Sequence, residues 1–215
     1  MINKHFGNMQ VDANVHYKFA NYITKGRWIS FWHQIDEVVK LNPKNVLEIG
    51  VGSRVFMLFL QHLNISFKSV DIDPLLRPDY VASVMKLPIK DNLFDVVTCF
   101  QVLEHLPFDN FIPALREIAR VSSKHVILSL PDAQCVWTYS IHVPKIQNVC
   151  FHLPRPQWSA PKSSVCKDHL WEINMKIAPL KRIIKCIEDA KLALIKTYRV
   201  PENPYHRFFI CKINN

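Results

Sequence analysis

The feature that most constrains this chain is a short apolar run that ends in two glycines. Residues 45–52 read Asn-Val-Leu-Glu-Ile-Gly-Val-Gly, and a helical pattern begins at residue 55. Glycine permits backbone angles that other residues avoid, and it lets a ligand approach the main chain because it has no Cβ. The following helix offers free N–H groups at its first turn. The segment therefore predicts a strand, a ligand-binding turn and a helix.

An acidic residue at the end of the next strand indicates which ligand this turn binds. Asp71 lies 21 residues after Gly50, at the end of the predicted strand over residues 66–73. In nucleoside-binding sheets, a carboxylate about 20 residues after the glycine turn accepts hydrogen bonds from the ribose hydroxyls. The two-glycine turn is a weak signal alone, but together with Asp71 it predicts a nucleoside site.

The rest of the chain alternates between strand and helix patterns, which predicts a parallel sheet covered by helices on both faces. The remaining predicted strands cover residues 79–83, 93–100, 124–131, 192–200 and 205–213, and the last two resemble an antiparallel hairpin. The predicted helices cover residues 28–40, 55–63, 111–121 and 179–190.

Length and composition fit one globular domain over residues 1–215. Residues 1–42 are expected to form a helical lid, and residues 132–170, which show no clear period, an insertion over the acceptor site. No apolar run reaches the roughly 18 residues that span a bilayer, so no membrane association is expected. The first ten residues do not resemble a signal peptide, which favours a cytoplasmic protein.

Positive charge is concentrated in the last third of the chain. Residues 141–215 carry 13 Lys and Arg against 5 Asp and Glu, whereas residues 1–140 carry 14 against 13. Such asymmetry can mark a surface that attracts a polyanion such as RNA, or it can be a solvated face that keeps the protein in solution. Both interpretations stay open.

Two side chains distinguish between nucleoside cofactors. A dinucleotide site needs a third glycine at the position of Val55, where the helix packs beneath a pyrophosphate. The carboxylate of Glu48, two residues before Gly50, would repel a phosphate. It suits instead a ligand that carries an ammonium and a sulfonium, as S-adenosyl-L-methionine does.

The motifs in order resemble those of class I S-adenosylmethionine-dependent methyltransferases, in the branch with an LPF…FD…EHL pattern. They are LEIGVG, VDIDP, LPIKDNLFDVVTCFQVLEHLP, REIARV and VILSLP, over residues 44–131. The resemblance implies a three-layer Rossmann-like α/β sandwich with a seven-stranded, mostly parallel sheet. It implies S-adenosyl-L-methionine as methyl donor and S-adenosyl-L-homocysteine as product.

The same resemblance assigns the donor-binding residues. Glu48, Gly50, Gly52 and Ser53 would line the methionine part, and Asp71 would hold the ribose. The remaining positions would contact adenine and the methionine end: Ile72, Ser83, Val84, Met85, Phe100 and Gln101.

Two positions depart from the family pattern. The family often has glycine where Arg54 stands, so the loop here is expected to differ in shape or to be partly closed by that side chain. It often has Asp where Ser83 stands, so the adenine amino group would need Ser83 or a backbone carbonyl. An inactive nucleoside-binding relative therefore stays a possible alternative.

Candidate catalytic residues lie on the acceptor side. His105, next to Glu104, either acts as a general base or packs beneath the cofactor without transferring a proton. His169 and Glu172, three residues apart on an expected helical turn, either bind the acceptor or anchor the insertion.

Several aromatic and histidine side chains of the insertion form either the wall of an acceptor pocket or a small core of their own. They are Trp137, Tyr139, His142, His152 and Trp158. Arg27 is a candidate partner for the methionine carboxylate. No metal site is predicted, because no pair of histidines or cysteines has ligand spacing.

The sequence therefore predicts a methyltransferase that acts on an unknown, most plausibly small-molecule acceptor. An RNA or polyanion methyltransferase that uses the basic last third is the first alternative. A nicotinamide oxidoreductase is opposed by Val55 and Glu48.

Overall fold

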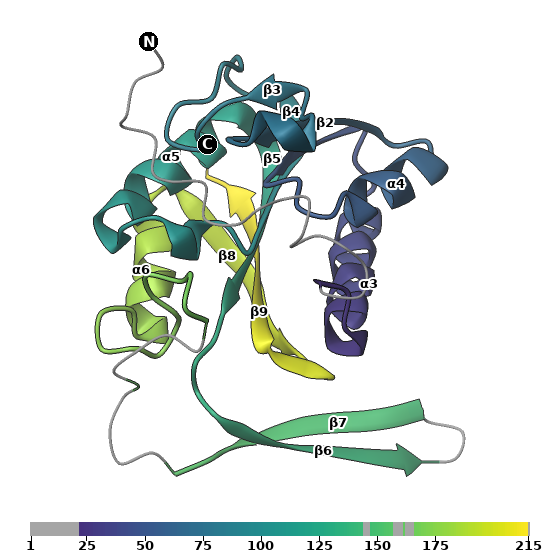
Figure 1. Ribbon diagram of the computed structural model, residues 1–215, viewed down its shortest axis with the longest axis vertical. Coiled ribbons are helices and arrows are strands. Elements are labelled where there is room, and N and C mark those ends of the chain that lie inside the picture. Colours follow the sequence, from purple (N-terminus) through teal and green to yellow (C-terminus); the bar gives the residue numbers. More distant parts are fainter. Residues whose placement is uncertain (1–21, 144–146, 157–160, 162–165, 215) are drawn as a thin grey trace.

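A seven-stranded sheet organises the molecule, and a two-stranded sheet lies beside it (Figure 1). The computed structural model describes residues 22–143, 147–156, 161 and 166–214. The strand order is β3-β2-β1-β4-β5-β9-β8; the first five strands pair in parallel, and β9 is antiparallel to both neighbours. The predicted mostly parallel sheet with an antiparallel C-terminal hairpin is confirmed.

The strands occupy the segments that the apolar pattern predicts. Their bounds are β1 (Asn45–Ile49), β2 (Ser66–Asp71), β3 (Tyr80–Val81), β4 (Phe94–Phe100), β5 (Ser122–Pro131), β8 (Leu192–Val200) and β9 (Asn203–Ile213). Central strands β1 and β4 are buried almost throughout, as expected of parallel strands covered on both faces. The turn between β8 and β9 is shorter than predicted, because β9 already begins at Asn203.

Helices cover both faces of this sheet and form the two outer layers of a three-layer sandwich. Helices α3 (Lys25–Lys40) and α4 (Val55–His62) lie on one face, and α5 (Phe111–Val121) and α6 (Leu180–Asp189) lie on the other (Figure 1). Each face has its own buried apolar cluster. Phe56, Leu60 and Phe208 are in the α3–α4 cluster, and Leu115, Ile183 and Phe209 are in the α5–α6 cluster.

Short 3₁₀ turns follow the strands at the carboxyl edge of the sheet. They are η1 (Pro74–Leu76), η2 (Leu103–His105) and η3 (Phe108–Asn110). The predicted helix over residues 111–121 is α5, and η2 and η3 occupy the chain between it and β4, with Pro107 before η3. This arrangement matters because it leaves η2 at the end of β4, facing the sheet edge.

A buried ion cluster fixes the end of β5 to the antiparallel strands. Oδ2 of Asp132 accepts hydrogen bonds from Nε of Arg199 at 2.9 Å and from Nε of Arg207 at 2.8 Å. Oδ1 accepts one from Nδ2 of Asn174 at 2.7 Å. These contacts join β5, β8, β9 and the segment before α6, although the residues are far apart in sequence.

The insertion contains regular structure that the sequence pattern did not indicate. Strands β6 (Val136–Val143) and β7 (Gln147–Pro154) form a long antiparallel hairpin below the main sheet (Figure 1). The expectation of an insertion without a period is therefore wrong over the hairpin. Trp137 pairs with Leu153 and Tyr139 with Phe151, so apolar side chains alternate onto one face as in any pleated strand pair.

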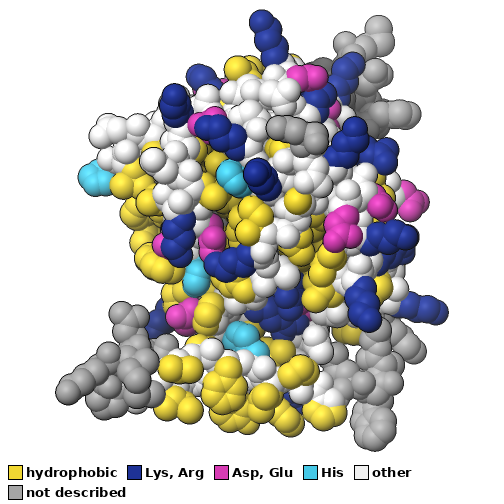
Figure 2. Space-filling model, turned by 180° about the vertical axis from the view of Figure 1, so that it is seen from behind, with side chains coloured by type: hydrophobic (Ala, Val, Ile, Leu, Met, Phe, Trp, Pro, Cys, Tyr) yellow, Lys and Arg dark blue, Asp and Glu magenta, His cyan; other side chains and the backbone are white. Residues whose placement is uncertain are grey.

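That apolar face is turned outward. Its side chains are all more than two-fifths exposed: Trp137, Tyr139, Ile141, Val149, Phe151 and Leu153. Figure 2 shows hydrophobic side chains gathered at the lower end of the molecule, where the hairpin lies. The opposite face lies toward the domain, since Sγ of Cys150 is 3.4 Å from the carbonyl oxygen of Pro201.

The N-terminal segment is described in part. Helix α3 is confirmed and starts three residues earlier than predicted, with Oγ1 of Thr24 accepting from the N–H of Arg27 at 3.2 Å. Residues 1–21 of the expected lid lie outside the described residues. Among the described residues, no helix has the length and apolar character that crossing a bilayer requires.

Candidate functional site

A cavity of about 400 Å³ lies at the carboxyl edge of the parallel strands. Its walls come from the turns after β1, β2, β3 and β4, from helix α3, and from two later segments around His169 and Tyr205. Open α/β sheets bind ligands at this edge, because the loops after several strands converge there. The volume falls within the range of small-molecule sites.

The turn after β1 requires glycine for two separate reasons. Gly50 has a φ of +86°, a left-handed conformation that side chains rarely adopt. A Cβ built on Gly50 would also lie 2.3 Å from Cγ2 of Val102, closer than two carbon atoms can approach. The bare backbone at this point therefore lets the loop after β4 pack against the turn, and both line the cavity.

Asp71 lies at the end of β2 with its carboxylate held in place at the cavity. Oδ2 accepts from the N–H of Val51 at 2.8 Å, and Oδ1 accepts from the N–H of Asp73 at 2.9 Å. Burial raises the pKa of Asp71 above its ordinary value, and these backbone donors oppose that shift. Each carboxylate oxygen has a further lone pair for a ligand hydroxyl.

Glu48 is buried in the wall of the same cavity. Burial raises its pKa well above the ordinary value, the nearby Asp71 carboxylate adds to this, and the Arg54 guanidinium opposes it. No group in the described part of the chain donates a hydrogen bond to Oε2. A buried carboxylate without a donor is costly, so the position suits a ligand cation.

Arg54 adopts a left-handed backbone conformation, which favours glycine. Its φ is 63°, and it precedes the first turn of α4. This conformation carries a strain cost of order 1 kcal/mol for a non-glycine residue. The side chain does not close the cavity, because Arg54 is absent from the residues that line it. That part of the expectation is wrong.

The other end of the cavity is built from η2 and the segment that precedes Trp171. The N–H of Leu170 donates to the carbonyl of Glu104 at 3.0 Å, and Nε1 of Trp171 donates to the carbonyl of Leu106 at 2.9 Å. Trp171 is buried against Phe108 and Phe111. The two hydrogen bonds anchor the end of the insertion on η2 and the residue after it, and the ring contacts anchor it on η3 and α5.

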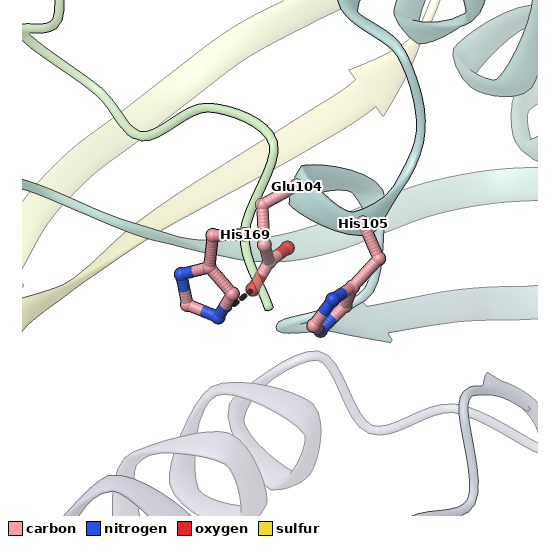
Figure 3. A group of neighbouring side chains, drawn as sticks. All are labelled: Glu104, His105 and His169. Carbon is pink, nitrogen blue, oxygen red and sulfur yellow. Dashed lines mark ion pairs between the residues drawn. The ribbon is translucent and has the colours of Figure 1, made fainter. Parts of the chain in front are cut away.

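This anchoring brings His105 and His169 close to Glu104 (Figure 3), and Glu172 contacts His169 from the other side. His169 Nδ1 is 2.9 Å from Oε1 of Glu172, and the same oxygen accepts from the hydroxyl of Tyr205 at 2.6 Å. Nδ1 of His105 is 3.0 Å from the carbonyl oxygen of Asp168. The predicted pairing of His169 with Glu172 is confirmed, although the residues form an irregular turn rather than a helix.

Glu104 and Glu172 are the fully buried members of this group. Burial raises the pKa of Glu104 to about 8, and the Glu172 carboxylate contributes in the same direction. Burial and the hydrogen bond to Glu172 raise the pKa of Tyr205. His206, also in the cavity wall, has its pKa lowered to about 3 by burial and by the charges of Arg27 and His169.

Comparison with known proteins relates part of this chain to a described family. Residues 47–130 match the family described as Methyltransferase domain. This segment is therefore similar to methyltransferase domains. The matched residues run from β1 to the end of β5, so they cover the donor-side strands and η2.

An uncharacterized protein of Methanocaldococcus jannaschii is 35% identical over 81 residues. The match covers 35% of this chain, and the chain spans about a third of the length of that relative.

Solved structures share the fold at low identity. One is the 1,6-didemethyltoxoflavin-N1-methyltransferase of Burkholderia thailandensis, with S-adenosylhomocysteine bound. It is 13% identical, with 86% of this chain and 79% of that chain covered and a TM-score of 0.57. Another is magnesium protoporphyrin IX methyltransferase of Synechocystis PCC 6803, with S-adenosylmethionine bound. It is 14% identical, with 88% of this chain and 80% of that chain covered and a TM-score of 0.56.

Almost every site residue that the sequence predicts lines one cavity. These are Arg27, Glu48, Gly50, Gly52, Ser53, Asp71, Ile72, Ser83, Val84, Phe100, Gln101, His105 and His169. Met85 does not reach the cavity lining, because its side chain packs against the α5–α6 core while its N–H donates to Oγ of Ser83 at 3.2 Å. The prediction for Met85 is therefore wrong.

The insertion aromatics do not belong to this cavity. Trp137, Tyr139, His142 and His152 are absent from its lining, and Trp137 and Tyr139 are exposed on the hairpin. Neither predicted alternative, pocket wall or small core, holds for Trp137 and Tyr139. Trp158 lies outside the described residues.

Tyr205 and His206 line the cavity. For residues 203–206, the sequence predicts a turn between the last two strands, with closure of the acceptor pocket as the alternative. His206 pairs with Pro131 in the antiparallel β5–β9 ladder, so the first residues of β9 lie beside the end of β5. No local motif marks this position. Only the antiparallel placement of β9 could have indicated it.

Proposed function

We propose that this protein is an S-adenosyl-L-methionine-dependent methyltransferase that acts on a small-molecule acceptor and releases S-adenosyl-L-homocysteine. The observation that carries the proposal is the placement of Glu48, Gly50 and Asp71 around one cavity. A second pair of candidate groups, His105 and His169, lines the same cavity. One cavity with a nucleoside end and a histidine end fits a transfer reaction.

The donor end matches the chemistry of the donor. The buried Glu48 carboxylate lacks a donor to Oε2 among the described groups, which favours a ligand that carries ammonium and sulfonium charge. Asp71 would accept from the ribose hydroxyls, and Ile72, Ser83 and Val84 would contact adenine. Phe100, Gln101 and Arg27 would surround the methionine end, with Arg27 near its carboxylate.

The donor supplies a methyl group on a sulfonium that is already a good leaving group. The protein's part is to align an acceptor atom with that methyl, and orientation alone accounts for much of the rate effect. His105 or His169 would take a proton from an acceptor that must lose one before attack. The hydrogen bonds to Asp168 and Glu172 fix the orientation of the two rings.

A small molecule is favoured over RNA as acceptor because the histidine end is enclosed by buried groups. Glu104 and Glu172 are fully buried there, and the nearby carboxylates would disfavour a phosphate chain. The basic last third supports the RNA alternative. Binding of an RNA oligonucleotide that falls steeply with salt concentration would support that alternative.

Calorimetric titration with S-adenosylmethionine, S-adenosylhomocysteine and NAD tests the proposal. We expect both sulfur nucleosides to bind and NAD to bind more weakly than either. Asp71→Ala should weaken both by at least about tenfold, which corresponds to about 1.4 kcal/mol. Asp91→Ala removes an exposed carboxylate outside the cavity and is the matched control. Preferential binding of NAD would overturn the proposal.

A further inference from the structure

Three potential metal ligands converge at the histidine end of the cavity. Glu104, His105 and His169 each offer one ligand atom, and the three atoms lie within 4.8 Å of one another (Figure 3). Glu104 and His105 come from η2, and His169 comes from the segment anchored on η2 by Trp171. We propose that these three residues bind a divalent transition-metal ion at the acceptor end of the cavity.

The first support is the environment of Glu104. Its carboxylate is fully buried, and no described neighbour donates a hydrogen bond to either oxygen. Nε2 of His169 lies 3.9 Å from Oε1, which is too long for a hydrogen bond. An ionised carboxylate in such a place costs several kcal/mol unless a cation compensates it. A bound metal ion would provide that cation.

The second support is the orientation of the two imidazoles. Nδ1 of His105 faces the carbonyl oxygen of Asp168 at 3.0 Å, and Nδ1 of His169 faces the carboxylate of Glu172 at 2.9 Å. Carbonyl and carboxylate oxygens only accept, so both Nδ1 atoms carry the hydrogen and both Nε2 atoms carry the lone pair. Metal-binding histidines characteristically donate their other ring N–H to such an oxygen.

The ligand set indicates the class of ion. Two imidazoles and one carboxylate suit Zn²⁺, Fe²⁺, Co²⁺ or Mn²⁺ better than Ca²⁺, which prefers oxygen ligands. Ligand atoms around a tetrahedral ion with bonds of 2.1 Å lie about 3.4 Å apart, so the 3.9 Å pair would close by about 0.5 Å. Three protein ligands leave at least one position open toward the cavity.

That open position gives the ion a role, which rests on the proposed methyl transfer. An oxygen or nitrogen of the acceptor bound there would lose its proton more readily and would be held in place for transfer. The inference reverses the sequence prediction of no metal site. Local ligand spacing could not indicate this group, because His169 is far from Glu104 and His105 in sequence and reaches them through the docking of Trp171 beside η2.

The test uses the untagged chain, dialysed against a chelator and titrated with Co²⁺. Calorimetry and the visible absorption of Co²⁺ report binding independently of methyl transfer. We expect one equivalent to bind, with affinity lowered at least 100-fold in His105→Gln/His169→Gln. Glu172→Gln, which removes only the carboxylate that orients His169, should weaken binding about tenfold. His62→Gln, an exposed histidine outside the cluster, should leave it unchanged.

Titration of the same samples with S-adenosylhomocysteine separates the two proposals. The double variant should still bind the nucleoside, which also shows that it is folded. Absence of stoichiometric Co²⁺ binding to the wild type, or equal binding to the double variant, would overturn the metal site. If the nucleoside still binds in that case, the donor assignment stands.

Discussion

The two ends of the cavity are assembled in different ways. The donor end comes from Glu48, Gly50 and Asp71, all within two consecutive strand–turn units. The acceptor end joins η2 to His169, Glu172 and Tyr205, which come from the insertion and from β9. The first depends on local backbone geometry, and the second depends on contacts between distant segments.

Because of this difference, we expect mutations at the two ends to have different effects on the structure. A change at the donor end should alter the glycine turn or one carboxylate and leave the rest of the sheet in place. A change in the long-range contacts should loosen several segments together, since the Asp132 cluster and the Trp171 anchor each join them. The predictions below compare the two ends, from the largest effect to the smallest.

Asp132→Asn should cause the largest loss. It leaves the buried guanidinium of Arg199 and the partly buried guanidinium of Arg207 without their carboxylate, and breaking a buried ion pair costs about 3–5 kcal/mol. Urea denaturation measures the change in unfolding free energy. Asp91→Asn, which breaks an exposed ion pair with Arg120, is the control and should cost below about 1 kcal/mol. Equal costs for the two variants would contradict the account of the acceptor end.

Gly50→Ala tests the local geometry of the donor end. The variant introduces a side chain at a φ of +86° and a clash with Val102, which together should cost about 2–4 kcal/mol. Adding Val102→Ala to this variant should restore the stability lost to the clash and leave the loss that comes from the positive φ. If the double variant is as unstable as the single one, the contact with Val102 is not the cause.

His206 should make the fold sensitive to acid. Its pKa falls from 6.5 in the unfolded chain to about 3 in the fold, so between these values the unfolded state binds the extra proton. Stability contributed by neutral His206 is therefore full above pH 6.5 and is lost as the pH falls. The slope approaches about 1.4 kcal/mol per pH unit, or about 2 kcal/mol by pH 5.

Denaturation of wild type and His206→Gln at several pH values measures this contribution. As the pH falls from 7 to 5, the unfolding free energy of the wild type should fall by about 2 kcal/mol relative to that of the variant. The buried carboxylates Glu48 and Glu104, whose raised pKa values change stability in the opposite direction, are present in both proteins. Their contribution therefore cancels in the difference. A pH-independent difference would show that His206 is not held neutral.

The hairpin should matter least to either end. Replacing Trp137, Tyr139 and Phe151 with serine removes exposed apolar side chains that do not line the cavity. Surface changes of this kind usually cost below about 0.5 kcal/mol each. Affinity for S-adenosylhomocysteine should change less than twofold. A large loss of affinity would place the hairpin at the site after all.

The features that short-range sequence patterns specify, namely the parallel strands and the donor-end residues, could be predicted from the sequence. The positions and parallel pairing of the first five strands follow from the alternation of strand and helix patterns, and Gly50 and Asp71 are linked by a spacing within one βα unit. The hairpin β6–β7 was missed because its alternation of Trp, Tyr and Ile with Thr and Ser was obscured by prolines and histidines nearby. Met85 was placed wrongly because adjacent residues of a turn can point in opposite directions.

The acceptor end was only partly predictable. Three-residue spacing indicated the contact of His169 with Glu172, but nothing local indicated that Tyr205 would share the same carboxylate oxygen. The position of Tyr205 follows from the pairing of β9 with β5, and that of His169 from the burial of Trp171. Both depend on tertiary packing, which a single sequence pattern does not specify.

The central claim is that donor and acceptor ends meet around one transferred methyl group. Nuclear Overhauser effects from bound S-adenosylmethionine, labelled with ¹³C in its methyl group, test it directly. The account predicts contacts from the methyl protons to the rings of His105 or His169, absent in the matching histidine variants. Methyl contacts confined to the hairpin residues, or none to either histidine in a saturated complex, would contradict it.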